Sequence, residues 1–148
     1  MELQIRKMVP DDYEPLYKLL SDPEVMKYLE PPFSETKTKQ YLLDAGLCDP
    51  PLVYAVDAQD QFIGYVIYHA YDEKSVEIGW VLLPEYWEKG YASELTGILI
   101  RKAKDDHKNV VMECAPRQSV TQKIAAKYGF TYCGRSEKLD VFRLFFEQ

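Results

Sequence analysis

The fold of this chain is decided by the stretch Glu77-Ile78-Gly79-Trp80-Val81-Leu82-Leu83-Pro84-Glu85-Tyr86-Trp87-Glu88-Lys89-Gly90-Tyr91-Ala92-Ser93. Its first part predicts a strand, Pro84 starts a loop, and a helical apolar stripe begins at Tyr91. Small residues at Gly90 and Ala92 would let backbone N–H groups approach a ligand, and a helix start carries about half a positive elementary charge. The pattern predicts an anion site that suits a pyrophosphate. The alternative is a glycine that only shapes the start of a helix.

Outward from this stretch, strand and helix patterns alternate. Strands are expected at residues 4–9, 52–56, 61–68, 75–83, 109–115, 130–133 and 141–146. Helices are expected at residues 11–20, 34–47, 91–104 and 120–128, with a further short helix through 25–29. Turn residues at 57–60 and 71–74 predict an antiparallel meander of three strands. Helices on both faces of a mixed sheet would bury these elements.

Length, charge and cysteine usage narrow the class of protein. A chain of 148 residues fits one domain with one core, expected here over residues 1–148. Its apolar runs are too short to span a bilayer and its N-terminus has no signal core, so we expect no membrane partner. The net charge of −6 argues against a nucleic-acid partner and is compatible with a cationic substrate. Three cysteines without C-x-x-C spacing argue against a disulfide framework or a metal site and favour the cytoplasm.

Three blocks of the chain resemble one known family. Trp87-x-x-Gly90-x-Ala92 resembles the acyl-CoA-binding motif of the GNAT superfamily of N-acetyltransferases, usually written Q/R-x-x-G-x-G/A. The tryptophan departs from that motif but is similar to the RimJ/RimL-like branch, in which an E-I-G-Y/W strand precedes P-E-Y-W-G-K-G-Y-A. Residues 21–25, which read S-D-P-E-V, and residues 115–130 resemble two further family segments. The resemblance therefore covers essentially the whole chain.

The resemblance implies a fold and a cosubstrate. The fold is the α/β (α+β) GNAT fold, a central mixed, mostly antiparallel sheet of about seven strands with helices on both faces and a splayed parallel pair at the cofactor site. The cosubstrate is acetyl-CoA, with no metal. Its pantetheine arm would pair with the strand that ends near Leu83, and its pyrophosphate would bind backbone N–H groups of residues 88–92. The cofactor-binding residues expected are Val81, Leu82, Leu83, Glu88, Lys89, Gly90, Tyr91, Ala92, Ser93 and Gln118.

The C-terminal block departs from the family at three positions. Gln118 stands where the family has an asparagine that usually contacts pantetheine, and Thr121 stands where it has a serine. Many members carry a tyrosine as general acid at the position that is Ala125 here, and Tyr128 is expected to pack instead. Thr121 is therefore the candidate that protonates or hydrogen-bonds the departing thiolate. The alternative is an ordinary residue of the first helical turn.

The family chemistry is direct attack of a neutral primary amine on the thioester carbonyl of acetyl-CoA. Making an alkylammonium neutral at pH 7 costs roughly 4–5 kcal/mol, so a base must take its proton. Glu77 is the candidate base, and a purely structural Glu77 is the alternative. A backbone N–H around Val81 to Leu83 would polarise the carbonyl oxygen.

The acceptor is either a small cationic amine or a protein N-terminus, and the acidic balance slightly favours the small amine. Tyr28, Phe33 and Tyr68 are expected to line its pocket. His69, at a strand end, is expected to be a surface residue, and Cys114 is expected to pack. Dimers are common in the family, so a homodimer stays open although no stretch of the sequence marks an interface.

Two other classes of function remain. One is a catalytically silent GNAT-like module that binds CoA as a sensor, which the missing tyrosine acid would permit. The other is an unrelated nucleotide-binding domain, for which Gly90-Tyr91-Ala92-Ser93 provides no phosphate-loop lysine.

Overall fold

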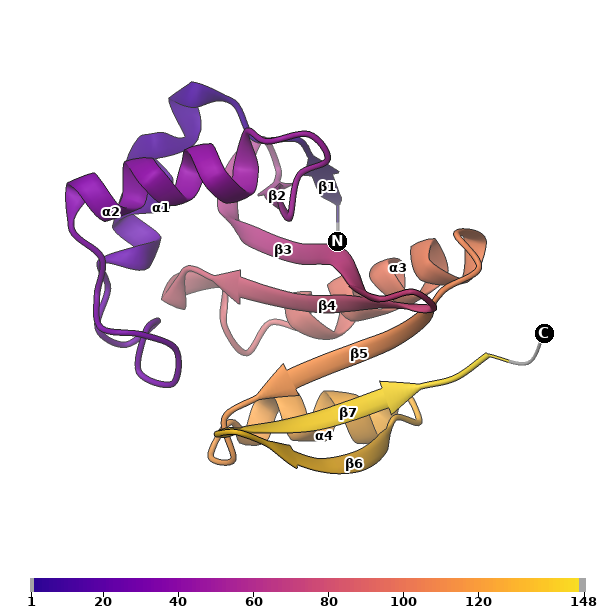
Figure 1. The fold of residues 1–148 in the computed structure, drawn as a ribbon. Coiled ribbons are helices and arrows are strands. Elements are labelled where there is room, and N and C mark those ends of the chain that lie inside the picture. The colour runs from indigo at the N-terminus through magenta and orange to yellow at the C-terminus, as the bar shows by residue number, and fades with distance from the viewer. Residues whose placement is uncertain (1, 147–148) are drawn as a thin grey trace.

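The computed structural model describes residues 2–146, which form a seven-stranded sheet with helices on both faces (Figure 1). The strands are β1 (Leu3–Arg6), β2 (Val53–Ala58), β3 (Gln61–Asp72), β4 (Ser75–Leu82), β5 (Asn109–Cys114), β6 (Thr131–Ser136) and β7 (Leu139–Leu144). Their order in space is β1-β2-β3-β4-β5-β7-β6, and β4–β5 is the parallel pair among antiparallel neighbours. The predicted mixed, mostly antiparallel sheet is confirmed.

The helices divide between the two faces of the sheet. In Figure 1, α1 (Tyr13–Leu20) and α2 (Glu35–Tyr41) lie in front, whereas α3 (Tyr91–Asp105) and α4 (Ser119–Lys127) lie behind. Successive strand residues point to opposite faces. In β4, Ile78 and Leu82 therefore pack in the core under α3, and Val81 packs in the core under α1 and α2. Short helical turns at η1 (Pro10–Asp12), η2 (Leu42–Gly46) and η3 (Pro84–Tyr86) complete the chain.

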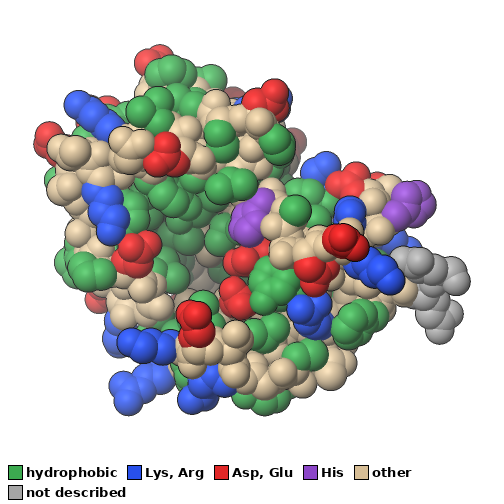
Figure 2. Space-filling model, viewed as in Figure 1, with side chains coloured by type: hydrophobic (Ala, Val, Ile, Leu, Met, Phe, Trp, Pro, Cys, Tyr) green, Lys and Arg blue, Asp and Glu red, His purple; other side chains and the backbone are tan. Residues whose placement is uncertain are grey.

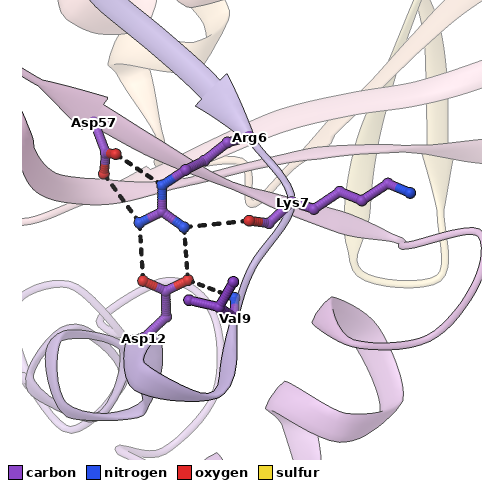
Figure 3. A network of polar contacts seen from close by, with 5 residues as sticks. All are labelled: Arg6, Lys7, Val9, Asp12 and Asp57. Carbon is purple, nitrogen blue, oxygen red and sulfur yellow. Dashed lines mark hydrogen bonds and ion pairs between the residues drawn. The ribbon is translucent and has the colours of Figure 1, made fainter.

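Arg6 fixes the N-terminal helical layer to the sheet (Figure 3). Its guanidinium on β1 donates to Asp57 on β2, with the Nε–Oδ2 distance at 2.7 Å, and makes two 2.9 Å bonds to Asp12 in η1. The Asp12 carboxylate also accepts from Val9 N–H at 2.8 Å. Such bidentate, charge-assisted bonds fix both distance and orientation. The network therefore sets where α1, which begins at the next residue, crosses the sheet.

One expectation about helices is wrong, and a second is confirmed with a change of helix type. Residues 25–29 form turns, because the Asp22 carboxylate accepts from Glu24 N–H at 2.8 Å and closes a tight turn there. The prolines at 31 and 32 then prevent a helix from continuing. The helix expected over 34–47 is α-helical only in α2 and continues as the wider turn of η2. As a result, Tyr28 and Leu29 are left exposed on a loop beside the sheet.

The strands β4 and β5 separate along their length. They pair only at Ser75–Asn109, Val76–Val110 and Glu77–Val111, although β4 continues to Leu82 and β5 to Cys114. Each strand stays paired on its far side, β4 to β3 and β5 to β7, so the separation opens between them without unravelling the sheet. The predicted splayed parallel pair is confirmed, and Glu77 occupies the last paired position.

Candidate active site

A cavity of about 530 Å³ lies beside the separated ends of β4 and β5. Four parts of the chain line it: the 24–29 loop, the end of β4 at Trp80–Leu82, the segment from Tyr86 to Ser93, and the turn with the start of α4 at 117–121. This volume is within the range of roughly 300–1,000 Å³ that small-molecule and cofactor sites occupy. The separation of two sheet strands therefore creates a site from segments that are distant in sequence.

The start of α3 forms one wall of the cavity. Gly90 is its N-cap with φ of 87°, a left-handed conformation that costs a residue with a β-carbon about 1–2 kcal/mol. The first N–H groups of a helix have no partner within it, and here they belong to Tyr91, Ala92 and Ser93, which all line the cavity. A helix start with free N–H groups favours an anion. The local geometry is thus that of the predicted anion site.

Trp87 has a structural role that explains its place in the motif. Its indole N–H donates to the carbonyl oxygen of Leu82 at 2.8 Å, which ties the loop before α3 back to the end of β4. Glu88 follows in a left-handed conformation, with φ of 59°, and turns the chain toward Gly90. Lys89 lies outside the cavity lining, with its ammonium 5.9 Å from the centre of the Tyr86 ring.

The opposite wall comes from the start of α4. Gln118 and Thr121 both line the cavity, as does Arg117, which the sequence did not single out. The Gln118 side-chain oxygen accepts from Ala115 N–H at 2.7 Å, so its amide N–H groups are the part left to meet a ligand. Thr121 is half-buried on the first turn of α4.

Two neighbouring positions on α4 belong to the packing. Ala125 is fully buried in the core under α3 and offers no hydroxyl group. The Tyr128 hydroxyl donates to the Ser93 carbonyl oxygen at 2.7 Å, and a β-carbon at Gly97 would lie 2.9 Å from that hydroxyl oxygen. Tyr128 therefore joins α4 to α3, outside the residues that line the cavity.

Of the three expected acceptor residues, the structure brings only Tyr28 to the cavity. Phe33 is 5% exposed and packs its edge on Tyr41, with ring centres 5.8 Å apart, in the core under α1 and α2. Tyr68 points to the opposite face, where its hydroxyl donates to Asp106 at 2.6 Å and burial raises its pKa. Strand alternation decides this, since Tyr68 shares its face with Val66, under α3. Placing Phe33 and Tyr68 in the pocket was therefore wrong.

Glu77 lies outside the cavity lining, on the face that carries Val81 and beyond the edge of α1 and α2. Its side chain is 21% exposed. Burial raises the pKa of the Glu77 carboxyl, the charge of His69 opposes this rise, and the nearby Glu113 carboxylate adds to it. Among the charged groups of residues 2–146, the ion-pair partner closest to Glu77 is His69, with 3.7 Å between Nε2 and Oε1. Glu77 is therefore a half-buried carboxylate with a weak partner.

His69, which the sequence places at a strand end and favours as a surface residue over one that faces the amine site, lies next to Glu77. It is directly opposite Glu77 across the β3–β4 ladder, and its side chain is 28% exposed. Figure 2 shows acidic side chains and a histidine together in the middle of the face, beside an apolar area below α1 and α2. The sequence feature that predicts this pairing is the short turn between the two strand patterns, because a hairpin with such a turn brings residues near 69 and 77 opposite each other.

Within residues 2–146, no helix is long and apolar enough to cross a membrane. In the same part of the chain, no group of three or more His, Cys, Asp or Glu side chains is placed to hold a metal ion.

Comparison with known proteins identifies the family. The family model described as the acetyltransferase (GNAT) domain matches residues 2–131. The chain is 31% identical over 134 residues to the uncharacterized N-acetyltransferase YnaD of Bacillus subtilis (strain 168), and the match covers 86% of this chain and 78% of YnaD. The chain therefore belongs to the GNAT family of acetyltransferases, as the sequence motifs predicted.

Two solved structures share the whole fold at lower identity. The spermidine N-acetyltransferase of Vibrio cholerae, in complex with CoA and spermine, has a TM-score of 0.78 at 21% identity, with 95% of this chain and 92% of that chain covered. The Salmonella typhimurium acetyltransferase that modifies the N-terminal serine of ribosomal protein L7/L12 has a TM-score of 0.80 at 16% identity, with 98% and 95% covered. At these identities the likeness shows the fold, and the RimJ/RimL-like branch stays a prediction.

Proposed function

We propose that this GNAT enzyme transfers the acetyl group of acetyl-CoA to the primary amine of a small cationic acceptor, by direct attack of the neutral amine on the thioester. The observation that carries the proposal is the separation of β4 from β5 directly after Glu77, with the cavity and the start of α3 at its open side. A peptide-like pantetheine arm that follows the free edge of β4 would run toward the point where the strands meet. The Glu77 carboxylate lies at that point, the last paired position of β4 and β5.

The residues around the cavity fit the cosubstrate. The N–H groups at the start of α3 would hold the pyrophosphate, and Arg117 and Lys27 add positive charge to the lining. The free edge of β4 at Trp80–Leu82 and the Gln118 amide would hydrogen-bond the pantetheine arm. The Leu82 N–H would polarise the carbonyl oxygen, because the Leu83 N–H already donates to the Ile63 carbonyl oxygen at 2.8 Å. Every one of these groups is in place before a ligand binds, which lowers the cost of ordering the site.

Glu77 would act as the general base through water. An extended strand rises about 3.3 Å per residue, so the Cα atom of Glu77 lies about 13 Å along β4 from that of Val81, and a chain of waters would carry the proton between the amine and the Glu77 carboxylate. A carboxyl with a raised pKa holds a proton better than an ordinary one, which suits the removal of a proton from an ammonium. Thr121, on the other wall of the cavity, would hydrogen-bond the thiolate that leaves as the C–S bond breaks. Because a thiol has a pKa near 8.5, that thiolate needs little help.

The surroundings of Glu77 favour a cationic acceptor over a neutral one. The Glu113 carboxylate is close enough to raise the cost of ionising Glu77. An ammonium placed between such groups relieves that cost. The net charge of −6 adds a long-range attraction for cations. A protein N-terminus is the second acceptor class and would need room for a peptide chain beside the 24–29 loop.

The first experiment is acetyl-CoA binding by calorimetry, followed by free-thiol release with polyamines, aminoglycosides, amino acids and N-terminal peptides. Binding with thiol release on polyamines or other small cationic amines supports the proposal. Release only with peptides assigns the second acceptor class. Binding without release identifies a silent CoA-binding module, and no binding overturns the proposed site.

Gly90→Val locates the cosubstrate in the structure. The left-handed conformation of Gly90 disfavours a β-branched residue and would turn the helix-start N–H groups, so we expect the Kd for acetyl-CoA to rise about 10- to 100-fold. Gly134→Val is the matched control. Gly134 has φ of 95° and open space around a β-carbon, on β6 outside the cavity lining, so it carries the same backbone cost without the loss of binding. Equal effects on binding in both variants would contradict the site.

A further inference from the structure

The hydrogen bond of His69 to the backbone orients its ring toward Glu77. Its Nδ1 lies 3.0 Å from the carbonyl oxygen of Ala70, and a carbonyl can only accept a hydrogen bond, so Nδ1 carries the proton. In the neutral ring, Nε2 is therefore the nitrogen with the free lone pair. That nitrogen faces Glu77, with 3.7 Å between Nε2 and Oε1. The separation is too long for a direct hydrogen bond and fits one bridging water or a small side-chain rotation.

The groups around this pair come from three strands and one helix. Tyr41 of α2, Tyr71 of β3 and Glu113 of β5 are close enough to interact electrostatically with Glu77, and next to them lie Tyr65 and Asp72 of β3 and Arg143 of β7. Most are occupied by each other: the Tyr71 hydroxyl donates to Glu113 at 3.2 Å, Arg143 pairs with Asp72 at 3.5 Å, and the Tyr41 and Tyr65 hydroxyls are 3.4 Å apart. Among residues 2–146, the ring of His69 is thus the ion-pair partner of Glu77, with a second nitrogen that faces the carboxylate.

We propose that His69 is a proton relay for the acetyl transfer, which accepts through Nε2 the proton that Glu77 removes from the acceptor amine and passes it to solvent. This inference rests on the proposed function, in which Glu77 is the base. His69 acts through Glu77 and contacts neither substrate, so it is a positioning and relay residue.

The proton balance of the step is simple. The acceptor ammonium gives one proton, through water, to the Glu77 carboxylate and becomes the neutral amine that attacks. Glu77 gives that proton to Nε2, which leaves Glu77 ionised and the His69 ring cationic. The ring then releases the proton to water, which reaches it because the side chain is 28% exposed. The carboxylate alone is more enclosed, so the relay joins it to bulk solvent.

His69→Asn tests the relay. The rate of thiol release from acetyl-CoA-loaded enzyme is measured in single turnovers at saturating amine and plotted against pH. An asparagine amide can still donate to the Ala70 carbonyl, but nothing then faces Glu77 in place of Nε2. We expect the rate plateau to fall about 3- to 10-fold. The acid limb of the pH profile should move to lower pH by about one unit or more, because a neutral ring is no longer required.

Two other profiles would overturn the relay. A simple ion pair predicts an acid limb that moves to higher pH, because Glu77 loses a neighbouring cation and protonates more readily. If His69 has no role in the reaction, neither the rate plateau nor the acid limb of the pH profile changes in His69→Asn. His107→Asn is the matched control, since His107 is the second of the two histidines, lies in the turn after α3, and has φ of 59°, which asparagine tolerates. It should leave the profile unchanged.

A measurement on the free protein separates failure of the relay from failure of the proposed function. With two histidines in the chain, the ring Cε1–H signals of His69 and His107 can be followed by NMR across pH. Glu77→Gln should change the pH-dependent shift of the His69 signal and leave that of His107 unchanged. If the His69 signal does not respond, the contact on which the relay depends is overturned, whatever the activity. If it responds but wild-type protein acetylates no amine, the proposed function fails and the relay fails with it.

Discussion

Asp12 and Glu77 are both largely buried carboxylates, and their partners differ. The Asp12 carboxylate, 7% exposed, accepts two bonds from Arg6 and one from Val9 N–H, all at 2.8–2.9 Å. Glu77, 21% exposed, has a histidine 3.7 Å away as its ion-pair partner. Burial alone would raise the pKa of Asp12, but these three bonds outweigh it and hold the pKa below its ordinary value. Burial of Glu77 is not offset in this way, and its pKa is raised.

The difference shows how one residue type serves two purposes in one fold. A carboxylate that accepts three short hydrogen bonds binds protons weakly and holds elements together, as Asp12 does for β1, β2 and η1. A half-buried carboxylate with few partners keeps its affinity for a proton, which a general base needs. The positions of carboxylates in the sequence do not separate these cases, whereas the geometry of their partners does.

The largest effect is expected from Glu77→Gln. If Glu77 is the base, acetyl transfer should fall about 10²- to 10⁴-fold with the fold intact, because the amide cannot take a proton. Thiol release and a thermal unfolding curve measure the two properties. Glu73→Gln, in the exposed turn between β3 and β4, is the control and should keep full activity. Full activity in Glu77→Gln would place the base elsewhere.

Asp12→Asn should give the opposite result. The variant loses the charged acceptor of two Arg6 bonds while Arg6 keeps Asp57, so the free energy of unfolding should fall by about 2 kcal/mol. Activity of the folded fraction should change less than about 2-fold, since Asp12 is remote from the cavity lining. Urea unfolding measures the loss. Asp11→Asn, at the exposed neighbouring position, should cost almost nothing, and an equal loss in both variants would contradict the role of the network.

The pH dependence of stability sharpens the contrast, because the two carboxyls shift in opposite directions. The lowered pKa of Asp12 stabilises the fold above the ordinary aspartate range, near pH 4, and this contribution disappears as pH falls through the lower folded value. The stability difference between wild type and Asp12→Asn should therefore shrink toward pH 3. Glu77, with a raised pKa, favours the fold at low pH and loses this contribution as pH rises past about 4.5. Urea titrations at several pH values measure both slopes, and slopes of the same sign would contradict the comparison.

The smallest effect is expected at Thr121. Removing its hydroxyl by Thr121→Ala should slow acetyl transfer about 2- to 5-fold, because a departing thiolate needs little acid help. Thr121→Ser keeps the hydroxyl and should restore the rate. A loss as large as that of Glu77→Gln would mean that thiolate departure, and not proton removal from the amine, limits the reaction.

Much of the fold and of the cosubstrate site could be predicted from the sequence. The periods of the strands and helices predicted the element order, and the residues from Trp87 to Ala92 predicted the helix start at which we propose the anion site. These features are local, since a glycine with positive φ or an apolar stripe needs no distant partner. The acceptor side was predicted poorly, because it depends on which face of the sheet Phe33 and Tyr68 meet.

The sequence by itself determined the element order through local propensity and the family through short motifs, and the resemblance to that family implied the separated parallel pair and the place of Glu77 on its first strand. Only the tertiary structure decided what that carboxylate faces. If the register of the Asp72–Ser75 pair continued unchanged along β3 and β4, Ala70 would lie opposite Glu77 and His69 would lie opposite Ile78. A register shift between Ala70 and Asp72 makes Tyr71 an extra residue and places His69 opposite Glu77 instead. A one-residue shift of register moves every side chain of a strand to the opposite face of the sheet, and the packing of both cores selects the register that is observed. The pairing of His69 with Glu77 therefore could not be found by considering single positions of the sequence.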